Sequence, residues 1–194
     1  MDITSTPNLK PFRDYSDHDV INQYAHVDGS VNKGTWVTIT AANGNTNVSQ
    51  NAGTAHLGYT SALSSNTPSR ATVLRSEVSW KIDSASAGDV VLGVLLYDVR
   101  ETNSWGESYV YQPKYERSEQ QVIVSGEAAP VLTDGIILLN GFAGTAGAGS
   151  GATIGTGAAA GTLVVADYTN AVGNVGKFLS SVDADGYAFF KVEC

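Results

Sequence analysis

Residues 90–99 read VVLGVLLYDV, and this stretch does most to decide the fold. It is almost entirely apolar, so it predicts a strand covered on both faces at the centre of the core. Gly93 interrupts the run, and a glycine inside a strand marks a bulge or a close approach by another backbone. Strands of this kind need partner strands on both sides.

A second strand is predicted over Thr72–Ile82, where apolar and polar residues alternate. The period of two places one row of side chains in the core and the other in water. Shorter runs bounded by Gly, Asn, Asp or Pro predict further strands at Thr35–Thr40, Ser108–Gln112, Gln120–Ser125, Gly135–Leu139, Thr162–Ala166 and Tyr187–Val192. Only Tyr115–Gln121 supports a turn or two of helix. We therefore predict an all-β, mostly antiparallel fold, either a small barrel or a sandwich.

Glycine-containing turns separate these predicted strands. Turn dipeptides that tolerate positive φ occur at Asp28-Gly29, Asn43-Gly44, Asp134-Gly135 and Asp185-Gly186. A glycine also comes shortly before an apolar pair in KGTWV (33–37), AGDVV (87–91) and AGTLV (160–164). We interpret each of these three as a turn that leads directly into a strand; their spacing is too irregular for a solenoid or propeller.

The segment Phe142–Leu163, FAGTAGAGSGATIGTGAAAGTL, carries no charge and few large side chains. Such a composition gives the segment little reason to adopt one conformation alone. Its length also exceeds that of ordinary connections. We predict that residues 142–162 form a flexible surface loop, within a single β domain at 20–194, that packs on a neighbouring subunit.

Residues 1–19 are predicted to be an extended arm, because Pro7 and Pro11 force their predecessors out of the helical region. Phe12 and Tyr15 are candidate partner-contact residues if the arm drapes over a neighbour. The alternative is a frayed terminus.

Composition narrows the function. The 194 residues carry a net charge of −8, with 11 Lys and Arg spread through the chain, which argues against nucleic-acid binding and favours a basic partner surface. No basic n-region, apolar h-region or membrane-length apolar run occurs, so we expect neither a signal peptide nor membrane insertion. The single cysteine, Cys194, allows no intrachain disulfide.

The sequence contains fragments of catalytic and cofactor-binding motifs, but the residues or elements that each motif also requires are absent. The stretch that begins at Asp183 lacks the acidic twelfth position of a calcium loop, and the glycines at 155–160 have no following helix for a dinucleotide. His18, His26 and His56 follow no metal-ligand spacing. We predict no enzyme activity, no cofactor and no metal.

An aromatic cluster at Trp105, Tyr109, Tyr111 and Tyr115 has two interpretations. Tyr and Trp are favoured at interfaces, yet the same rings can cap a β core. We assign Trp105 to the core and assign partner contact to Tyr109 and Tyr111, which would share one face of a strand.

Three stretches together resemble a known family. They are VDGSVNKGTWV (27–37), VIVSGEAAPVL (122–132) and GKFL (176–179) followed by DGYAFFKV (185–192), and they look like the head decoration, or cement, proteins of tailed bacteriophages. The resemblance implies a small β protein, often a trimer, that coats the capsid and stabilises contacts between major capsid protein subunits. The expected location is therefore the virion, after synthesis in the host cytoplasm. Alternatives are a tail or fibre component and a carbohydrate-binding adhesin module.

Overall fold

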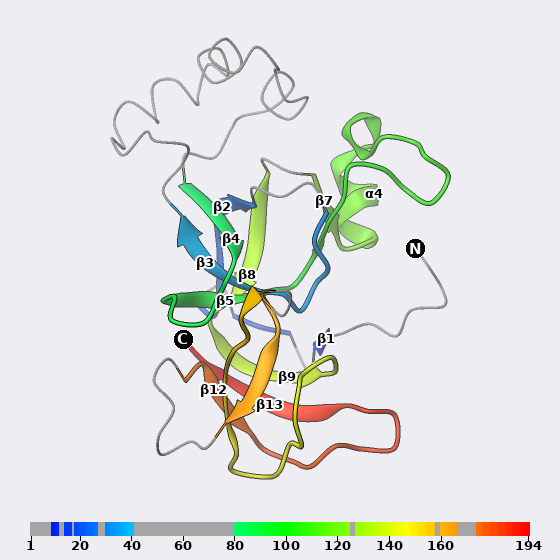
Figure 1. Ribbon diagram of the computed structural model, residues 1–194. Helices are drawn as coiled ribbons and strands as arrows, with labels where there is room; N and C mark the ends of the chain where they lie inside the picture. The colour runs from blue at the N-terminus through cyan, green and yellow to red at the C-terminus, as the bar shows by residue number, and fades with distance from the viewer. Residues whose placement is uncertain are drawn as a thin grey trace.

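The computed structural model describes residues 9–11, 14–16, 18–26, 30–40, 80–124, 127–157, 160–166 and 174–194. These residues form two main β-sheets, one above the other in Figure 1, with a small helical lobe beside the upper one. The prediction of an all-β, mostly antiparallel fold is confirmed.

The upper sheet has five strands and closes on itself in the order β2-β4-β3-β5-β8. We call it the closed sheet. Its pairings are antiparallel except that β2 runs parallel to β4. Its strands are β2 (Val20–His26), β3 (Trp36–Thr40), β4 (Trp80–Ser84), β5 (Val91–Leu95) and β8 (Ala128–Leu132).

The lower sheet has six strands in the order β1-β9-β13-β12-β10-β11, and every pairing in it is antiparallel. We call it the open sheet. Its strands are β1 (Leu9–Pro11), β9 (Asp134–Leu139), β10 (Gly151–Ile154), β11 (Leu163–Ala166), β12 (Gly176–Phe178) and β13 (Ala188–Glu193). Only Thr133 separates β8 from β9, so the chain passes directly from one sheet to the other.

The remaining described elements lie between β5 and β8 in the sequence. Strands β6 (Asp98–Val99) and β7 (Val122–Ile123) pair in parallel, and the 3-10 helix η1 (Tyr109–Tyr111) and the helix α4 (Lys114–Glu119) lie between them in the sequence. The predicted helical turn at Tyr115–Gln121 is thus confirmed, shifted by one or two residues.

The largest hydrophobic cluster contains residues from both sheets. Trp36 of β3 meets Phe190 of β13 edge to face, with ring centroids 5.7 Å apart, and Phe190 in turn meets Phe178 at 4.9 Å. All three side chains are fully buried. A second cluster joins the closed sheet to β6 and β7, because it contains Val37, Ile82 and Leu95 together with Val99 and Ile123.

The predicted central strand at 90–99 is present as two pieces, β5 and β6, interrupted at Leu96 and Tyr97. Both interpretations of Gly93 are confirmed. A Cβ atom at Gly93 would lie 2.2 Å from the carbonyl oxygen of Leu132, so β8 approaches too closely for a side chain. Val37 pairs with Gly93 and Thr38 with Val91, which leaves Leu92 as the extra residue of a bulge.

The three glycine turns are also confirmed. Gly34, Gly88 and Gly161 have φ of 87°, 94° and 75°, values that favour glycine, and each lies in a turn just before β3, β5 or β11. Asp185-Gly186 forms a turn in the β12–β13 connection, where Asp183 Oδ1 accepts hydrogen bonds from the backbone N–H groups of Asp185 and Tyr187. Asp134-Gly135 opens strand β9 and is not a turn, whereas Asp28-Gly29 and Asn43-Gly44 lie outside the described residues.

Other strand predictions vary in outcome. Those at Thr35–Thr40, Gly135–Leu139, Thr162–Ala166 and Tyr187–Val192 correspond to β3, β9, β11 and β13, and that at Gln120–Ser125 contains the shorter β7. Of the strand predicted at Thr72–Ile82, only the last three residues are described, and they lie in β4. The strand predicted at Ser108–Gln112 is wrong, because residues 109–111 form η1.

The prediction for the glycine- and alanine-rich segment is wrong at its centre. Residues 151–154 form β10, which pairs with β11 and β12 of the same chain. Ala146, Ala152 and Ile154 are buried in the main cluster, and Phe142 packs against Phe178 with ring centroids 4.8 Å apart. The pairing partners of β10 are therefore strands of its own chain.

The predicted arm also pairs within the chain. Leu9 is fully buried in the main cluster and starts β1, which pairs with β9 at the edge of the open sheet. The Tyr15 hydroxyl donates a 2.8 Å hydrogen bond to the carbonyl oxygen of Ile136, and its ring lies where a Cβ atom at Gly135 would meet it. Tyr15 therefore fastens the segment to its own sheet, and Phe12 lies outside the described residues.

Candidate binding surface

Three exposed aromatic side chains lie close together in the sequence. Trp105 is 85% exposed, Tyr111 73% and Tyr115 66%. All belong to residues 100–121, between β6 and β7, which we call the aromatic lobe. It projects beside the closed sheet in Figure 1, where α4 marks it.

The base of the aromatic lobe is fastened by backbone and side-chain hydrogen bonds. The backbone N–H of Arg100 donates to Ile123 O at 2.9 Å, and that of Asp98 donates to Gln121 O at 2.9 Å. The Arg100 guanidinium donates to Ser30 Oγ, to the carbonyl oxygen of Val31 and to Asn32 Oδ1. The lobe is therefore joined to the turn that precedes β3.

The turn that carries Trp105 is closed by Asn103. Its Oδ1 accepts hydrogen bonds from the backbone N–H groups of Trp105 at 3.0 Å and Glu107 at 2.9 Å, and its Nδ2 donates to Glu107 Oε2 at 2.8 Å. Gly106 supplies a φ of 79°, and Thr102 forms a β-bridge with Ser108. The indole is thus presented by a backbone whose conformation is already fixed.

The structure separates the two tyrosines that were predicted to share one face. Tyr109 is only 4% exposed and packs with Val122 and Val124, and its hydroxyl donates to Gln120 Oε1 at 3.1 Å. Burial, and then the nearby Asp98 carboxylate, raise the pKa of Tyr109. Since η1 turns the backbone, Tyr111 points to solvent instead.

Of the four predicted contact residues, only Tyr111 is exposed in the aromatic lobe. Tyr109 is a core residue, Tyr15 lies on the open sheet and Phe12 is not described. The assignment of Trp105 to the core is wrong. The sequence NSWGE (103–107) carried the signal for it, because Asn followed by Gly three residues later is typical of a side-chain-closed turn.

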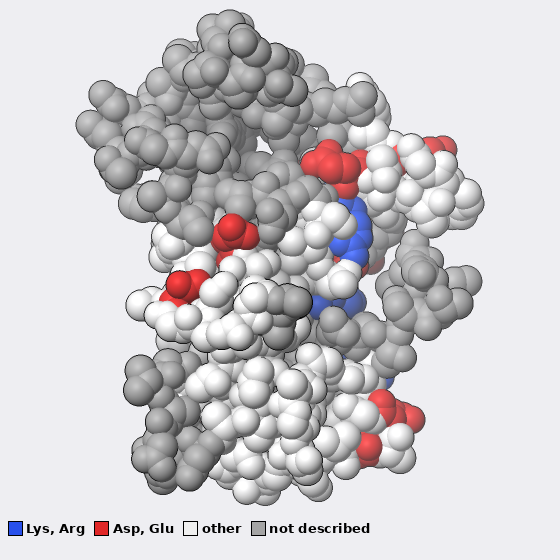
Figure 2. All heavy atoms as spheres, in the orientation of Figure 1, with Lys and Arg blue, Asp and Glu red and all other residues white. Residues whose placement is uncertain are grey.

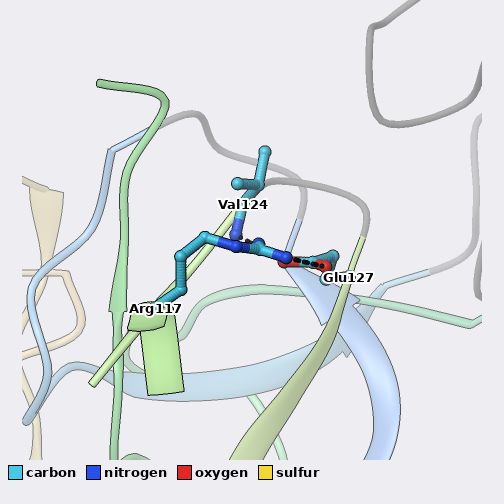
Figure 3. Close-up of polar contacts among 3 residues, drawn as sticks. All are labelled: Arg117, Val124 and Glu127. Atoms are coloured by element: carbon cyan, nitrogen blue, oxygen red, sulfur yellow. Dashed lines mark hydrogen bonds and ion pairs between the residues drawn. The ribbon is translucent and has the colours of Figure 1, made fainter. Parts of the chain in front are cut away.

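A buried ion pair holds the second half of the aromatic lobe. Arg117 of α4 donates from Nη1 to Glu127 Oε2 at 2.5 Å and from Nη2 to Oε1 at 3.2 Å (Figure 3). Glu127 Oε2 also accepts the backbone N–H of Val124 at 3.0 Å. The two side chains are 4% and 14% exposed, so α4 is fastened just before β8 by a pair largely withdrawn from water.

The outer surface of the aromatic lobe is acidic. Among its described side chains, the exposed charged ones are all carboxylates: Glu101, Glu107 and Glu119. The described cations turn inward, because Arg117 is buried and Arg100 bonds to residues 30–32. Figure 2 shows acidic side chains at the rim of the lobe.

In the described part of the chain, no three His, Cys, Asp or Glu side chains group in a way that could hold a metal ion. His18 is exposed, the side chain of His26 is not described, and His56 lies outside the described residues. The described helices are all too short or too polar to cross a bilayer.

Comparison with known proteins identifies no relative. Neither a family model, nor a curated protein, nor a solved structure matches this chain.

Proposed function

We propose that this chain is a non-enzymatic structural protein that binds the surface of a larger assembly through its aromatic lobe. The observation that carries the proposal is Trp105, 85% exposed on a turn closed by Asn103. An exposed indole of this kind contributes little to folding, whereas a buried Trp at an interface is among the strongest contributors to binding.

The assembly that we propose is the head of a tailed bacteriophage, with the protein acting as a capsid decoration protein on the major capsid protein. The all-β fold agrees with what the resemblance implies. The lobe is suited to docking because its backbone is fixed before binding, which lowers the entropy lost on association. The same resemblance underlies a proposed homotrimer in the virion, which mass measurement in solution tests.

The test uses purified protein and phage heads that lack it, with cosedimentation as the readout. Wild-type protein should bind, and Trp105→Ala should weaken binding by about tenfold or more, as loss of a central interface Trp does. Val90→Ala is the matched control, since Val90 is 87% exposed but lies in the turn between β4 and β5. Absence of wild-type binding would refute the head assignment, and localisation of labelled protein to tails would favour a tail or fibre component.

A carbohydrate-binding module is the second candidate, favoured by the exposure of Trp105 and Tyr111 together. Sugar rings stack on exposed aromatic faces, and neighbouring polar side chains hold their hydroxyls. Tyr109 is buried and takes no part in such a surface. Glycan-array binding that disappears in Trp105→Ala and Tyr111→Ala would favour this candidate over the capsid.

A further inference from the structure

The exposed side chains of the aromatic lobe combine aromatic rings with carboxylates. Trp105, Tyr111 and Tyr115 supply the rings, and Glu101, Glu107 and Glu119 supply the negative charge. Rings attract cations over their faces, and nearby carboxylates add Coulomb attraction. The combination is suited to a positively charged group.

The Trp105 ring and the Glu107 carboxylate belong to one turn. Asn103 accepts both backbone N–H groups through Oδ1 and donates from Nδ2 to Glu107 Oε2 at 2.8 Å. The carboxylate is therefore oriented by Asn103 rather than free to sample many rotamers. Its second oxygen has room for a further donor, because a carboxylate accepts several hydrogen bonds.

Charge complementarity identifies the partner surface. The described cations of the lobe are engaged with the chain itself, Arg117 with Glu127 and Arg100 with residues 30–32. The described side chains of the lobe include no exposed cation that could repel a basic partner. The whole chain carries a net charge of −8, which acts in the same direction at long range.

We propose that the aromatic lobe docks on a basic protein surface, with an arginine or lysine side chain of the partner over the Trp105 ring and beside the lobe's carboxylates. This inference rests on the proposed function, since it specifies the chemistry of the surface that the lobe binds. An arginine fits best, because its planar guanidinium stacks on an indole and donates to a carboxylate at the same time.

The first experiment uses the isolated protein and a fluorescent octa-arginine peptide, with anisotropy as the readout. Trp105→Ala should weaken binding about tenfold and Trp105→Phe less, because a smaller ring keeps part of the attraction. Glu101→Gln with Glu119→Gln should weaken binding about threefold and flatten its salt dependence. The matched control is Asp134→Asn with Asp185→Asn, which removes two exposed carboxylates outside the lobe.

The inference would be overturned if the double variant in the lobe and the control double variant lost affinity for the peptide equally, or if Trp105→Ala lost none. The peptide would then respond only to the overall charge of the protein. The second experiment repeats the head-binding assay at about 50 and about 500 mM NaCl, where screening differs strongly. Binding to heads that is insensitive to salt and to the Glu variants would overturn the inference and leave the proposed function standing. No binding to heads would remove the proposed function, while the peptide assay still decides the lobe's chemistry.

Discussion

Replacing Glu127 by glutamine should destabilise the protein more than the loss of an exposed salt bridge would. The change keeps the shape of the side chain and an oxygen that can accept the Val124 N–H. It removes the negative charge opposite Arg117, which is 4% exposed on its side chain. An arginine cannot lose its proton at ordinary pH, so its charge would stay in a site poor in water.

The magnitude follows from the contacts. Two charge-assisted hydrogen bonds, at 2.5 Å and 3.2 Å, are weakened at once. Breaking one side of a buried ion pair costs about 3–5 kcal/mol. Because the Glu127 side chain is still 14% exposed, water can partly replace it, and we expect the lower end, about 3 kcal/mol. For a chain of this size that corresponds to a fall in Tm of about 6–12 °C.

Urea denaturation followed by circular dichroism measures this loss, and a double-mutant cycle tests its cause. Arg117→Leu should be about as damaging as Glu127→Gln, whereas Arg117→Leu with Glu127→Leu should recover at least half of the loss, since no charge is then left unpaired. A loss below about 1 kcal/mol for Glu127→Gln, which is the range of an exposed pair, would refute the reasoning. So would a double variant less stable than both single ones.

Three further predictions concern the sheets. Gly93→Ala should lower the free energy of unfolding by about 3 kcal/mol, because the new Cβ would lie 2.2 Å from Leu132 O. Gly88→Ala should lower it by about 1 kcal/mol, because a Cβ there meets nothing within 4 Å and only the φ of 94° is unfavourable. Thermal denaturation of the two variants measures the difference. The pKa of Glu193 is lowered, first by its hydrogen bond with Lys191, so Glu193→Gln should destabilise the folded protein at pH 7. The difference in stability from wild type should shrink as the pH falls below 4.5, the ordinary pKa of Glu. A difference that grows in acid would contradict this. Burial, and then the Asp134 carboxylate, raise the pKa of Cys194 to about 12. A thiol reagent at pH 8 should therefore react much faster with the urea-unfolded chain than with the native one, because the native thiol is less often ionised; equal rates would contradict the raised pKa.

The backbone conformation at several glycines could be predicted from the sequence. The glycines at 34, 88 and 161 predict turns because only glycine adopts positive φ without strain, and all three adopt it. Gly93 was readable for the same kind of reason, since a strand interior tolerates glycine where another backbone comes close. These features depend on a few adjacent residues.

Three other features were missed, and only one of them depends on partners distant in the sequence. Tyr109 and Tyr111 alternate with Val110, yet Pro113 and the start of α4 follow directly, and η1 replaces the strand. Strand β10 lies in the glycine- and alanine-rich segment, whose composition predicted a loop, and it pairs with β11 on one side and β12 on the other. Trp105 was assigned to the core as one of the rings that would cap it, and the Asn103 turn that exposes it was not recognised.

The place of β13 in the open sheet has a consequence for synthesis. It lies between β9 and β12, although it is the last strand in the sequence. It is synthesised after the other five strands of the open sheet, so until Ala188 and the following residues emerge, the β1–β9 pair has no link through β13 to the β12-β10-β11 group. The open sheet therefore cannot assemble strand by strand in chain order, and it is completed only when β13 inserts between strands that precede it.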